Sequence, residues 1–285
     1  MAAALMTLIT DFGATDGYPA MMEGVIRGIA PSVDVVNVTH EVPPQNLSHA
    51  SFVLGRVARA FPAETIHLIV VDPGVGTARR ALILIGPDGS RFIGPDNGVF
   101  SHVLAWSGLP APEVHARRYM SPYRASLPAG FGAHVIESGP LLTQKRSVTF
   151  HGRDVFAPVG GHLASGHDPS EFGPSVNEVT LLHLPAPQVL ESEIRGRIQY
   201  VDGFGNLVTD LPAGAMEETG AVPIVSVGGK RINGLSASYA DGSGVGALVG
   251  SHGFLEVFVT NGSAARFLKA SVADPVSVAP SRTGG

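Results

Sequence analysis

The pattern of apolar and polar positions divides the chain into two parts. In the first part, short apolar runs alternate with segments in which apolar residues recur at helical spacing. The runs at residues 5–10, 33–38 and 65–71 predict strands, and the periodic segments at 18–29 and 47–61 predict helices. This alternation is typical of a mostly parallel sheet flanked by helices on both faces. We therefore expect an α/β fold for the N-terminal part.

The remainder of this part gives weaker signals. Residues 81–85 and 91–93 predict a further pair of strands, and a turn then leads into a short helix over residues 99–106. Residues 118–146 show little periodicity, so we expect a long loop or an insertion there. Asp154 is placed to cap the helix that follows it.

Helical periodicity nearly disappears beyond residues 184–187. Short strands separated by glycine-rich turns are predicted at residues 194–201, 206–211, 222–227, 245–249 and 254–260. This spacing is typical of a small all-β barrel or sandwich. We therefore predict an N-terminal α/β domain over residues 1–186 and a smaller C-terminal β-barrel domain over residues 187–285.

Composition and charge exclude several classes of protein. The chain has 285 residues, a formal net charge of −5 and no basic stripe or tail, which argues against a nucleic-acid partner. It has no cysteine, so disulfides, thiolate metal sites and a cysteine nucleophile are excluded. The first ten residues are too short for a membrane span and lack the basic start of a signal peptide, so we expect a cytoplasmic protein with no membrane partner. The histidine spacings match no metal motif, and we expect no bound metal.

Aspartates stand at the ends of two predicted strands. Asp11 follows the first strand, and Asp72 follows the apolar run at 65–71 and precedes a Pro-Gly turn. Ligands of open α/β sheets bind beyond the carboxyl ends of the strands, so we expect both aspartates and the loop at 40–46 to line one edge. Alternatively, Asp72 only bonds backbone amides of its own loop. His151 lies between two regular elements, where catalytic residues are commonly carried.

Glycine-rich segments of the second part are less specific. The turn at residues 201–206 carries an aspartate, a phenylalanine and an asparagine, and either a binding role or the turn alone would explain its glycines and Asn206. Residues 244–250 superficially match a dinucleotide-binding fingerprint, but the spacing is wrong and no helix follows.

Several separated motifs together resemble one family. They are Thr-Asp-Phe-Gly at 10–13, Val-Asp-Pro-Gly-Val-Gly-Thr-Ala-Arg-Arg at 71–80, Thr-Phe-His-Gly-Arg-Asp at 149–154, and Asp-Gly-Phe-Gly-Asn at 202–206 with Gly-Ser-His-Gly-Phe-Leu-Glu at 250–256. This combination resembles the S-adenosylmethionine hydrolase (adenosine-forming) family, also called the hydroxide adenosyltransferases, which is related to the fluorinases and chlorinases. The resemblance covers nearly the whole chain, except that residues 120–146 are longer than the family usually has there.

The resemblance implies a reaction and an assembly. The reaction is hydrolysis of S-adenosyl-L-methionine to adenosine and L-methionine, by attack of an activated water or hydroxide on C5′, with no cofactor besides the substrate. The assembly is a homotrimer whose active sites lie between subunits. Asp72, Arg79 and His151 match the catalytic set. Asp72 also matches a substrate-binding position. The resemblance assigns Asp11 to the ribose hydroxyls, and Asn206 and the backbone near Val259 to the adenine, with Phe204 beside it. It places Asp202 and His252 near the methionine part, and Ser251 and Glu256 as further ligand contacts.

The chemistry agrees with this assignment. The sulfonium makes methionine a good leaving group, so the reaction needs an oxygen nucleophile aligned behind C5′. Arg79 would stabilise a developing hydroxide, Asp72 would orient Arg79, and His151 would act either as the base or as an orienting group.

Two alternatives are a halogenase of the same superfamily and a non-catalytic adenosine- or S-adenosylmethionine-binding protein. The halogenases carry Tyr, Thr and Ser at the positions of Asp72, Val75 and Gly152, which argues against the first. A pure binder needs no water-activating group, which argues against the second.

Overall fold

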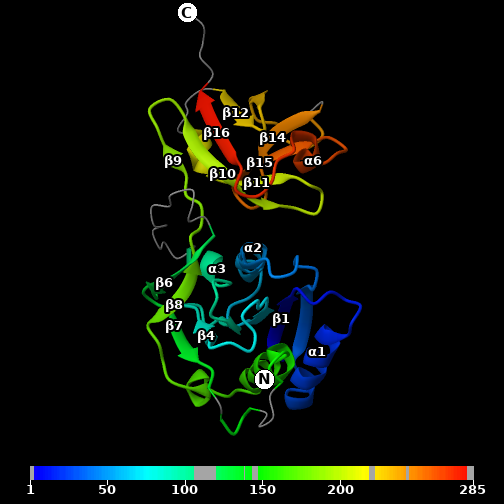
Figure 1. Cartoon of the computed structure of the whole chain (residues 1–285), viewed down its shortest axis with the longest axis vertical. Helices are drawn as coiled ribbons and strands as arrows, with labels where there is room; N and C mark the ends of the chain where they lie inside the picture. The colour runs from blue at the N-terminus through cyan, green and yellow to red at the C-terminus, as the bar shows by residue number, and fades with distance from the viewer. Residues whose placement is uncertain are drawn as a thin grey trace, which may run out of the picture. The chain divides into compact units, whose positions relative to one another are not determined.

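The computed structural model describes residues 3–105, 120–137, 139–142, 147–217, 222–241 and 244–280. This part of the chain forms two compact units, which Figure 1 shows in ribbon form. The first unit holds residues 3–105 and the described residues of 121–183, and the second holds those of 184–280 together with Met120. The domain limits at residues 186 and 187 stay a prediction.

A mixed sheet forms the centre of the first unit. Its described strands are β1 (Leu5–Thr10), β2 (Asp34–Thr39), β3 (Ile66–Val70), β4 (Ala81–Ile85), β5 (Arg91–Pro95) and β7 (Gly132–Val135). They lie in the order β2-β1-β3-β5-β4-β7. The four strands β2, β1, β3 and β5 run parallel, whereas β4 is antiparallel to both of its neighbours. The mostly parallel sheet is therefore confirmed.

Helices cover both faces of this sheet. The helices α1 (Tyr18–Ile29) and α4 (Ala157–Ala164) pack on one face, where Met6 and Leu8 of β1 are fully buried. The helices α2 (Leu47–Ala58) and α3 (Ser101–Ala105) pack on the other face, against Ile9. Successive strand residues point to opposite faces, so one apolar strand contributes to two cores. Burial of these side chains stabilises the sheet. The carboxyl ends of its parallel strands thereby have fixed positions, and the loops that follow β1 and β3 begin there.

The segment 118–146 was expected to be a long loop or an insertion, and its described residues contradict the loop because they contain two strands. β6 (Pro122–Ser126) pairs antiparallel with β8 (Glu178–Leu182) in a separate ribbon, and β7 extends the main sheet. Exposed and half-buried residues alternate along β6, so it has no apolar run for a sequence pattern to detect. The other expectations for residues 106–119, 138 and 143–146, including the end of the helix at 99–106, lie outside the described residues.

The expected cap at Asp154 is wrong. The helix begins at a π-helical turn, Gly152–Phe156, which leads directly into α4, and Asp154 lies inside that turn. Its carboxylate accepts a hydrogen bond from the Ser147 backbone N–H at 2.7 Å and pairs with Arg153. The Asp154 carboxylate therefore accepts from the preceding loop, whereas the sequence pattern predicted that it would accept from the first turn of the helix. A short 3₁₀ helix, Pro169–Phe172, follows farther along the chain and carries a capping box from Asp168.

The second unit is a nearly closed antiparallel barrel. Its described strands are β9 (Gln188–Val189), β10 (Ile194–Val201), β11 (Leu207–Pro212), β12 (Pro223–Val227), β13 (Lys230–Asn233), β14 (Val245–Val249), β15 (Phe254–Val259) and β16 (Pro275–Pro280), with the short helices α5 (Ala213–Glu217) and α6 (Ala264–Leu268). The order is β13-β12-β16-β10-β11-β15-β14, with β9 on β10. The end strands β13 and β14 also approach each other. Valine, isoleucine and leucine side chains fill the interior, and the all-β expectation is confirmed.

Candidate active site

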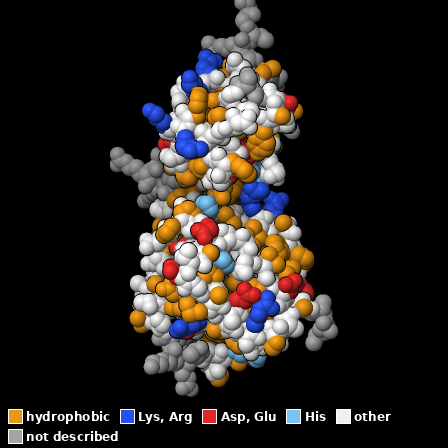
Figure 2. All heavy atoms as spheres, turned by 90° about the vertical axis from the view of Figure 1, so that its right-hand side faces the viewer, with side chains coloured by type: hydrophobic (Ala, Val, Ile, Leu, Met, Phe, Trp, Pro, Cys, Tyr) orange, Lys and Arg blue, Asp and Glu red, His pale blue; other side chains and the backbone are white. Residues whose placement is uncertain are grey.

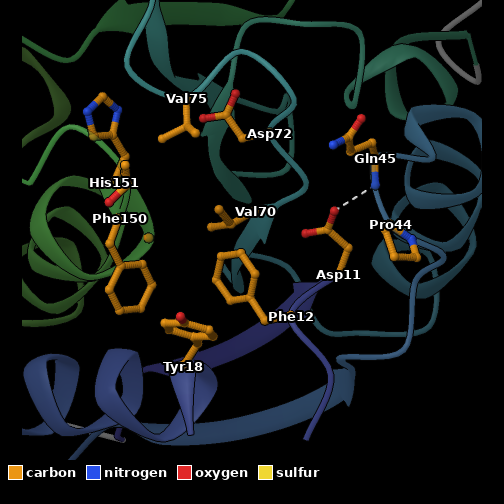
Figure 3. Close-up of a pocket in the computed structure, with 12 residues that line it drawn as sticks. Asp11, Phe12, Tyr18, Pro44, Gln45, Val70, Asp72, Val75, Phe150 and His151 are labelled. Atoms are coloured by element: carbon orange, nitrogen blue, oxygen red, sulfur yellow. Dashed lines mark hydrogen bonds between the residues drawn. The ribbon is translucent and has the colours of Figure 1, made fainter. Parts of the chain in front are cut away.

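A pocket of about 330 Å³ opens at the carboxyl ends of β1 and β3. Its lining residues are Asp11, Phe12, Tyr18, Pro44, Gln45, Val70, Asp72, Val75, Thr149, Phe150, His151 and Gly152. Figure 3 shows the polar side chains of Asp72, His151 and Asp11 on one part of the wall and a cluster of aromatic rings on another. Both strand-end aspartates and the loop before α2 therefore meet at one edge of the sheet, as predicted, and the start of the π-helical turn lies beside them.

Asp72, Arg79 and His151 form one hydrogen-bonded network. Arg79 donates from Nε to both carboxylate oxygens of Asp72 at 2.9 Å, and its Nη2 contacts Asp72 as well. The same Nη2 lies 2.9 Å from Nδ1 of His151. The Arg79 guanidinium also stacks over the Phe156 ring, 5.3 Å from its centroid. Arg79 is thus held from three sides, which restricts its side chain to one geometry.

The Arg79 contact fixes the protonation pattern of the His151 ring. A guanidinium carries donors and no acceptor, so Nδ1 of His151 must accept the hydrogen bond. The ring proton of the neutral imidazole is then on Nε2, and His151 presents a donor at that atom. This arrangement favours an orienting role for His151 over a basic one.

Asp11 is a second pocket carboxylate, and it has a different environment. Its Oδ2 accepts a hydrogen bond from the Gln45 backbone N–H at 2.8 Å. Burial raises the pKa of Asp11 above that of an ordinary aspartate, although the hydrogen bond from Gln45 opposes the rise. A carboxylate of this kind can accept hydrogen bonds from hydroxyl groups of a ligand.

Three aromatic rings pack edge to face at the pocket. The ring centroids of Phe12, Tyr18 and Phe150 lie 5.0 to 5.8 Å apart. Gly152 packs against two of these rings, since a Cβ at this position would lie within 3.1 Å of Phe12 and Phe150, and of Met22. A side chain at position 152 would therefore require these neighbours to move by a few tenths of an ångström.

The turn at residues 202–206 is in the second unit and is held by its own aspartate. Asp202 Oδ1 accepts hydrogen bonds from the backbone N–H groups of Phe204 and Asn206 at 2.9 and 2.8 Å, and Asn206 Nδ2 donates to Asp202 Oδ2 at 3.0 Å. Gly205 adopts φ of 85°, and a Cβ there would overlap Ser263. The turn leaves Phe204 82 % exposed. An exposed ring on a rigid turn is suited to stacking against a flat ligand.

His252, Glu256 and Tyr239 form a second network in this unit, in which the side chains of His252 and Glu256 are buried and Tyr239 is exposed. The Phe254 N–H donates to Nδ1 of His252, so the ring proton is on Nε2. The Nε2 of His252 then donates to Glu256 Oε2 at 2.8 Å. Tyr239 donates to the other carboxylate oxygen at 2.7 Å, and burial together with Glu256 raises the pKa of Tyr239 to about 12. A Cβ at residue 250 would overlap His252 and Glu256, so this pair requires a glycine there.

The structure assigns the predicted residues to two groups. Asp11, Asp72 and His151 line the pocket of the first unit, and Arg79 joins two of them. The second group comes from the barrel, where the pairing of β11 with β15 brings the turn at 202–206 beside the strand that ends at Val259. It comprises Asp202, Phe204, Asn206, Ser251, His252, Glu256 and Val259. Ser251 is exposed, whereas Glu256 is 3 % exposed. Their roles toward a ligand stay predictions.

Three residues near these groups were missed by the sequence reasoning. Tyr18 is the first residue of the predicted helix and Gln45 lies in the predicted edge loop, so the position of each beside the strand ends was a usable signal. Tyr239 lies in a polar stretch outside every predicted element, and no signal marked it.

Three further features of the described residues bear on the class of protein. No group of three or more His, Asp or Glu side chains lies close enough there to hold a metal ion. Within the same residues, no helix is long and apolar enough to cross a membrane. On the face drawn in Figure 2, Lys and Arg side chains lie in several separate groups.

The fold and the pocket define an α/β protein with a small-molecule site at the strand ends, followed by an antiparallel barrel. Comparisons with known proteins agree over most of the chain. Residues 6–173 match the SAM hydroxide adenosyltransferase N-terminal domain, and residues 196–277 match the corresponding C-terminal domain. The chain belongs to the SAM hydroxide adenosyltransferase family.

Individual relatives support this family membership. An (R)-S-adenosyl-L-methionine hydrolase of Thermus thermophilus is 36 % identical over 94 % of this chain and 96 % of its own length. A fluorinase of Actinoplanes is more distant, at 25 % identity over 76 % of this chain and 74 % of its own. The crystal structure of an uncharacterized conserved protein from Thermotoga maritima superposes with a TM-score of 0.83 at 30 % identity, covering 96 % of this chain and 99 % of that one.

Proposed function

We propose that this protein hydrolyses S-adenosyl-L-methionine to adenosine and L-methionine. The observation that carries the proposal is the Asp72–Arg79–His151 network at a pocket that also contains Asp11. The hydrolase relatives at 34 to 38 % identity support it, whereas fluorinases are more distant. A protein that only bound a nucleoside would not require a guanidinium held between a carboxylate and an imidazole.

The reaction is a displacement at C5′. The water oxygen forms a bond to C5′, the C5′–sulfur bond breaks, its electron pair neutralises the sulfonium, and one proton leaves the water. Rigid placement of the water and the ribose can supply several kcal/mol, about 7 to 11 in ideal cases. A site with little bulk water favours the approach of a hydroxide-like oxygen to a cation, because the charges cancel.

We assign separate roles to the three groups of the network. Arg79 stabilises negative charge on the attacking oxygen. His151 donates from Nε2 and orients the water, since its Nδ1 is engaged by Arg79. Asp72 holds Arg79 and accepts the water proton. Asp72→Asn should then lose more turnover than His151→Gln, which keeps a side-chain donor; the reverse order would return the basic role to His151.

Binding of the rest of the substrate is assigned from the family resemblance. Asp11 accepts from the ribose hydroxyls, Asn206 and the backbone at Val259 contact the adenine, and Phe204 stacks beside it. Asp202 and His252 serve the methionine part, with Ser251 and Glu256 as further contacts. No cofactor takes part, and the protein acts in the cytoplasm without a nucleic-acid or membrane partner.

We further propose a homotrimer in which each active site is shared by two subunits. The 82 % exposure of Phe204 supports this, because a ring used for stacking needs a facing surface. The test mixes Arg79→Ala subunits with Asn206→Ala subunits after reversible dissociation. If sites are shared, mixed assemblies regain activity that neither variant has alone. No regain would show that each site is built from a single chain.

The function is tested by the fate of oxygen in oxygen-18 water. S-adenosyl-L-methionine is incubated with the protein in the presence of abundant chloride or fluoride, and the products are analysed by mass spectrometry. We expect adenosine labelled at the 5′-hydroxyl, and L-methionine. A 5′-halo-deoxyadenosine as main product would favour the halogenase alternative, whereas intact substrate with measurable binding would favour the non-catalytic one.

The pocket itself disfavours halide capture. Val75 lines the wall and Gly152 packs against three side chains, so neither position offers a side-chain donor to an anion. A neutral water faces no repulsion from Asp72 and can both donate and accept hydrogen bonds there.

A further inference from the structure

The loop that carries Asp72 and Arg79 joins two strands that are not neighbours in the sheet. It runs from β3 to β4, and β5 lies between these two strands in the sheet. Neighbouring strands lie about 4.8 Å apart, so the two ends of the loop are separated by about twice that distance. The loop must therefore pass over the carboxyl end of β5, where the turn at residues 96–98 begins.

This turn holds both ends of the loop. The Asn97 side chain donates from Nδ2 to the Val71 carbonyl at 3.0 Å, directly before Asp72. The Asp96 backbone N–H donates to the Arg80 carbonyl at 2.9 Å, directly after Arg79. The Asp96 carboxylate also accepts from the Arg80 guanidinium at 2.9 and 2.6 Å.

The Asn97 bond controls the direction in which Asp72 leaves the strand. The Val71 carbonyl and the Asp72 nitrogen belong to one planar peptide group, so a bond to the carbonyl fixes that plane. Val71 is fully buried, and its carbonyl would otherwise have to find another partner. Asn97 itself is held, because its Oδ1 accepts from the Val99 N–H at 3.3 Å. This bond orients the amide so that its donor points to Val71.

We propose that Asn97 is a positioning residue for the Asp72–Arg79 pair. The proposal rests on the function proposed above for that pair. Asn97 is not one of the residues that line the pocket, and it acts through the Val71–Asp72 peptide. When this anchor is lost, Asp72 shifts, and Arg79 and His151 shift with it because the three side chains are hydrogen-bonded in series.

The test uses Asn97→Ala and the nearly isosteric Asn97→Asp, which replaces the donor by an acceptor. We expect kcat to fall by about tenfold to a hundredfold, the scale expected for a small misplacement of a catalytic group. Adenosine affinity should be unchanged, because Asp11 and the aromatic wall are carried by other segments.

Ser101→Ala is the matched control on the far side of the same turn. Ser101 is 2 % exposed, donates to the Gly98 carbonyl at 2.6 Å and accepts from the Leu182 N–H at 2.7 Å. Its loss removes comparable hydrogen bonds without touching either end of the loop. We expect Ser101→Ala to lower Tm and leave kcat unchanged.

A second measurement separates this proposal from the proposed function. The ring nitrogen signals of His151 are followed by NMR against pH, since Nδ1 accepts from Arg79. In both Asn97 variants we expect these signals and their titration to change, whereas Ser101→Ala leaves them as in the wild type. If the wild type does not hydrolyse the substrate but this difference is found, the positioning role stands and the proposed function fails.

The opposite outcomes overturn the positioning role. A folded Asn97 variant with unchanged kcat and unchanged His151 signals would do so, and so would an equal loss of kcat in Ser101→Ala. If Asn97→Ala did not fold, Asn97→Asp would carry the test. If neither folded, Asn97 would be a residue of the fold rather than of the site, and the proposal would be rejected.

Discussion

Two neighbouring arginines, Arg79 and Arg80, each bind an aspartate, and the two pairs leave different groups available for chemistry. The partner of Arg79 is Asp72, which lines the pocket, and Arg79 also reaches His151. The partner of Arg80 is Asp96, whose side chain is 1 % exposed. Asp96 accepts additional bonds from Arg124 and from the Thr180 N–H.

The difference shows that an ion pair alone does not define a site. Around Asp96 every contact lies within the fold, so the pair joins β4, β5, β6 and β8 and contributes to stability. The Asp72–Arg79 pair faces the pocket, so its electric field acts on a ligand bound there. Two further aspartates, Asp11 in the pocket and Asp210 in the barrel, extend the comparison. Each accepts a backbone N–H, and neither forms an ion pair with an arginine among the described residues.

Removing Asp96 should have the largest effect on stability. Asp96→Ala leaves Arg80 partly buried beside the unpaired Thr180 N–H, and we expect the free energy of unfolding to fall by about 3 to 5 kcal/mol. The measurement is equilibrium unfolding in urea. Arg124→Ala is the control, since this side chain is 53 % exposed and should cost much less. Equal losses in the two variants would contradict the interpretation of Asp96 as the centre of the cluster.

Replacing Arg79 should affect turnover instead. Arg79→Ala removes the cation beside the attacking oxygen, and we expect kcat to fall by about a hundredfold or more while adenosine affinity stays near that of the wild type. Arg80→Ala is the matched variant one residue away; it keeps the backbone bond from the Asp96 N–H to the carbonyl of residue 80, so we expect the loss to fall mainly on Tm. Steady-state kinetics and thermal unfolding of both variants test the contrast. Similar profiles for the two would remove the distinction between the pairs.

Asp210 is a buried aspartate that forms no ion pair with an arginine among the described residues, and it should make stability depend on pH. Among the described residues its Oδ2 has no hydrogen-bond partner, and burial raises its pKa from 3.8 to about 6. Between these values the folded state keeps a proton that the unfolded state has lost, so stability should fall as pH rises from about 4 to about 6 and then level off. We expect a loss of about 2 to 3 kcal/mol for the barrel from this group.

Asp210→Asn tests this pH dependence. Asparagine keeps an oxygen for the Arg197 N–H, which donates to Asp210 at 2.7 Å, and it cannot ionise. Denaturant unfolding of the second unit from pH 4 to pH 7 should lose the slope attributed to Asp210. An unchanged slope in the variant would assign it to other groups.

Asp11 should give the smallest effect, and on binding rather than on turnover. Asp11→Asn weakens the proposed acceptor for the ribose hydroxyls, so we expect adenosine affinity to fall by about tenfold, near the value of one hydrogen bond to a charged group. Because the pKa of Asp11 is raised, wild-type affinity should begin to fall on acidification at a higher pH than an ordinary aspartate would give. Calorimetric titration against pH measures both effects. A pH-independent affinity in the wild type would contradict them.

Much of the fold could be predicted, because burial on one or both faces leaves a pattern in the sequence. The bounds of β1, α1, β10 and β14 agree with the predicted ranges. β6 could not be found, because it alternates between exposed and half-buried residues and its partner β8 is more than fifty residues away. Asp154 was misassigned because an aspartate before a helix can accept from the preceding loop as well as from the helix.

The candidate site was predictable where it follows from topology. Asp11 and Asp72 were placed by the rule that parallel strands end at one edge, and that edge carries the pocket. The bond between Arg79 and His151 joins residues 72 apart in sequence, and its direction fixes a ring tautomer that no pattern contains. The packing of Gly152 against Met22 and two phenylalanines likewise depends on tertiary contacts.

The strand order also has a consequence for how the molecule folds. β5 comes after β4 in the chain but is inserted between β3 and β4, so the hairpin of β4 and β5 must dock onto β3 through its second strand. Until that docking occurs, nothing holds the start of β4 at the right distance from the end of β3. The final geometry of the acid and the guanidinium is therefore fixed only after this docking step, which is slow relative to hairpin formation. In a refolding experiment, recovery of enzymatic activity should lag behind recovery of secondary structure and report insertion of this strand.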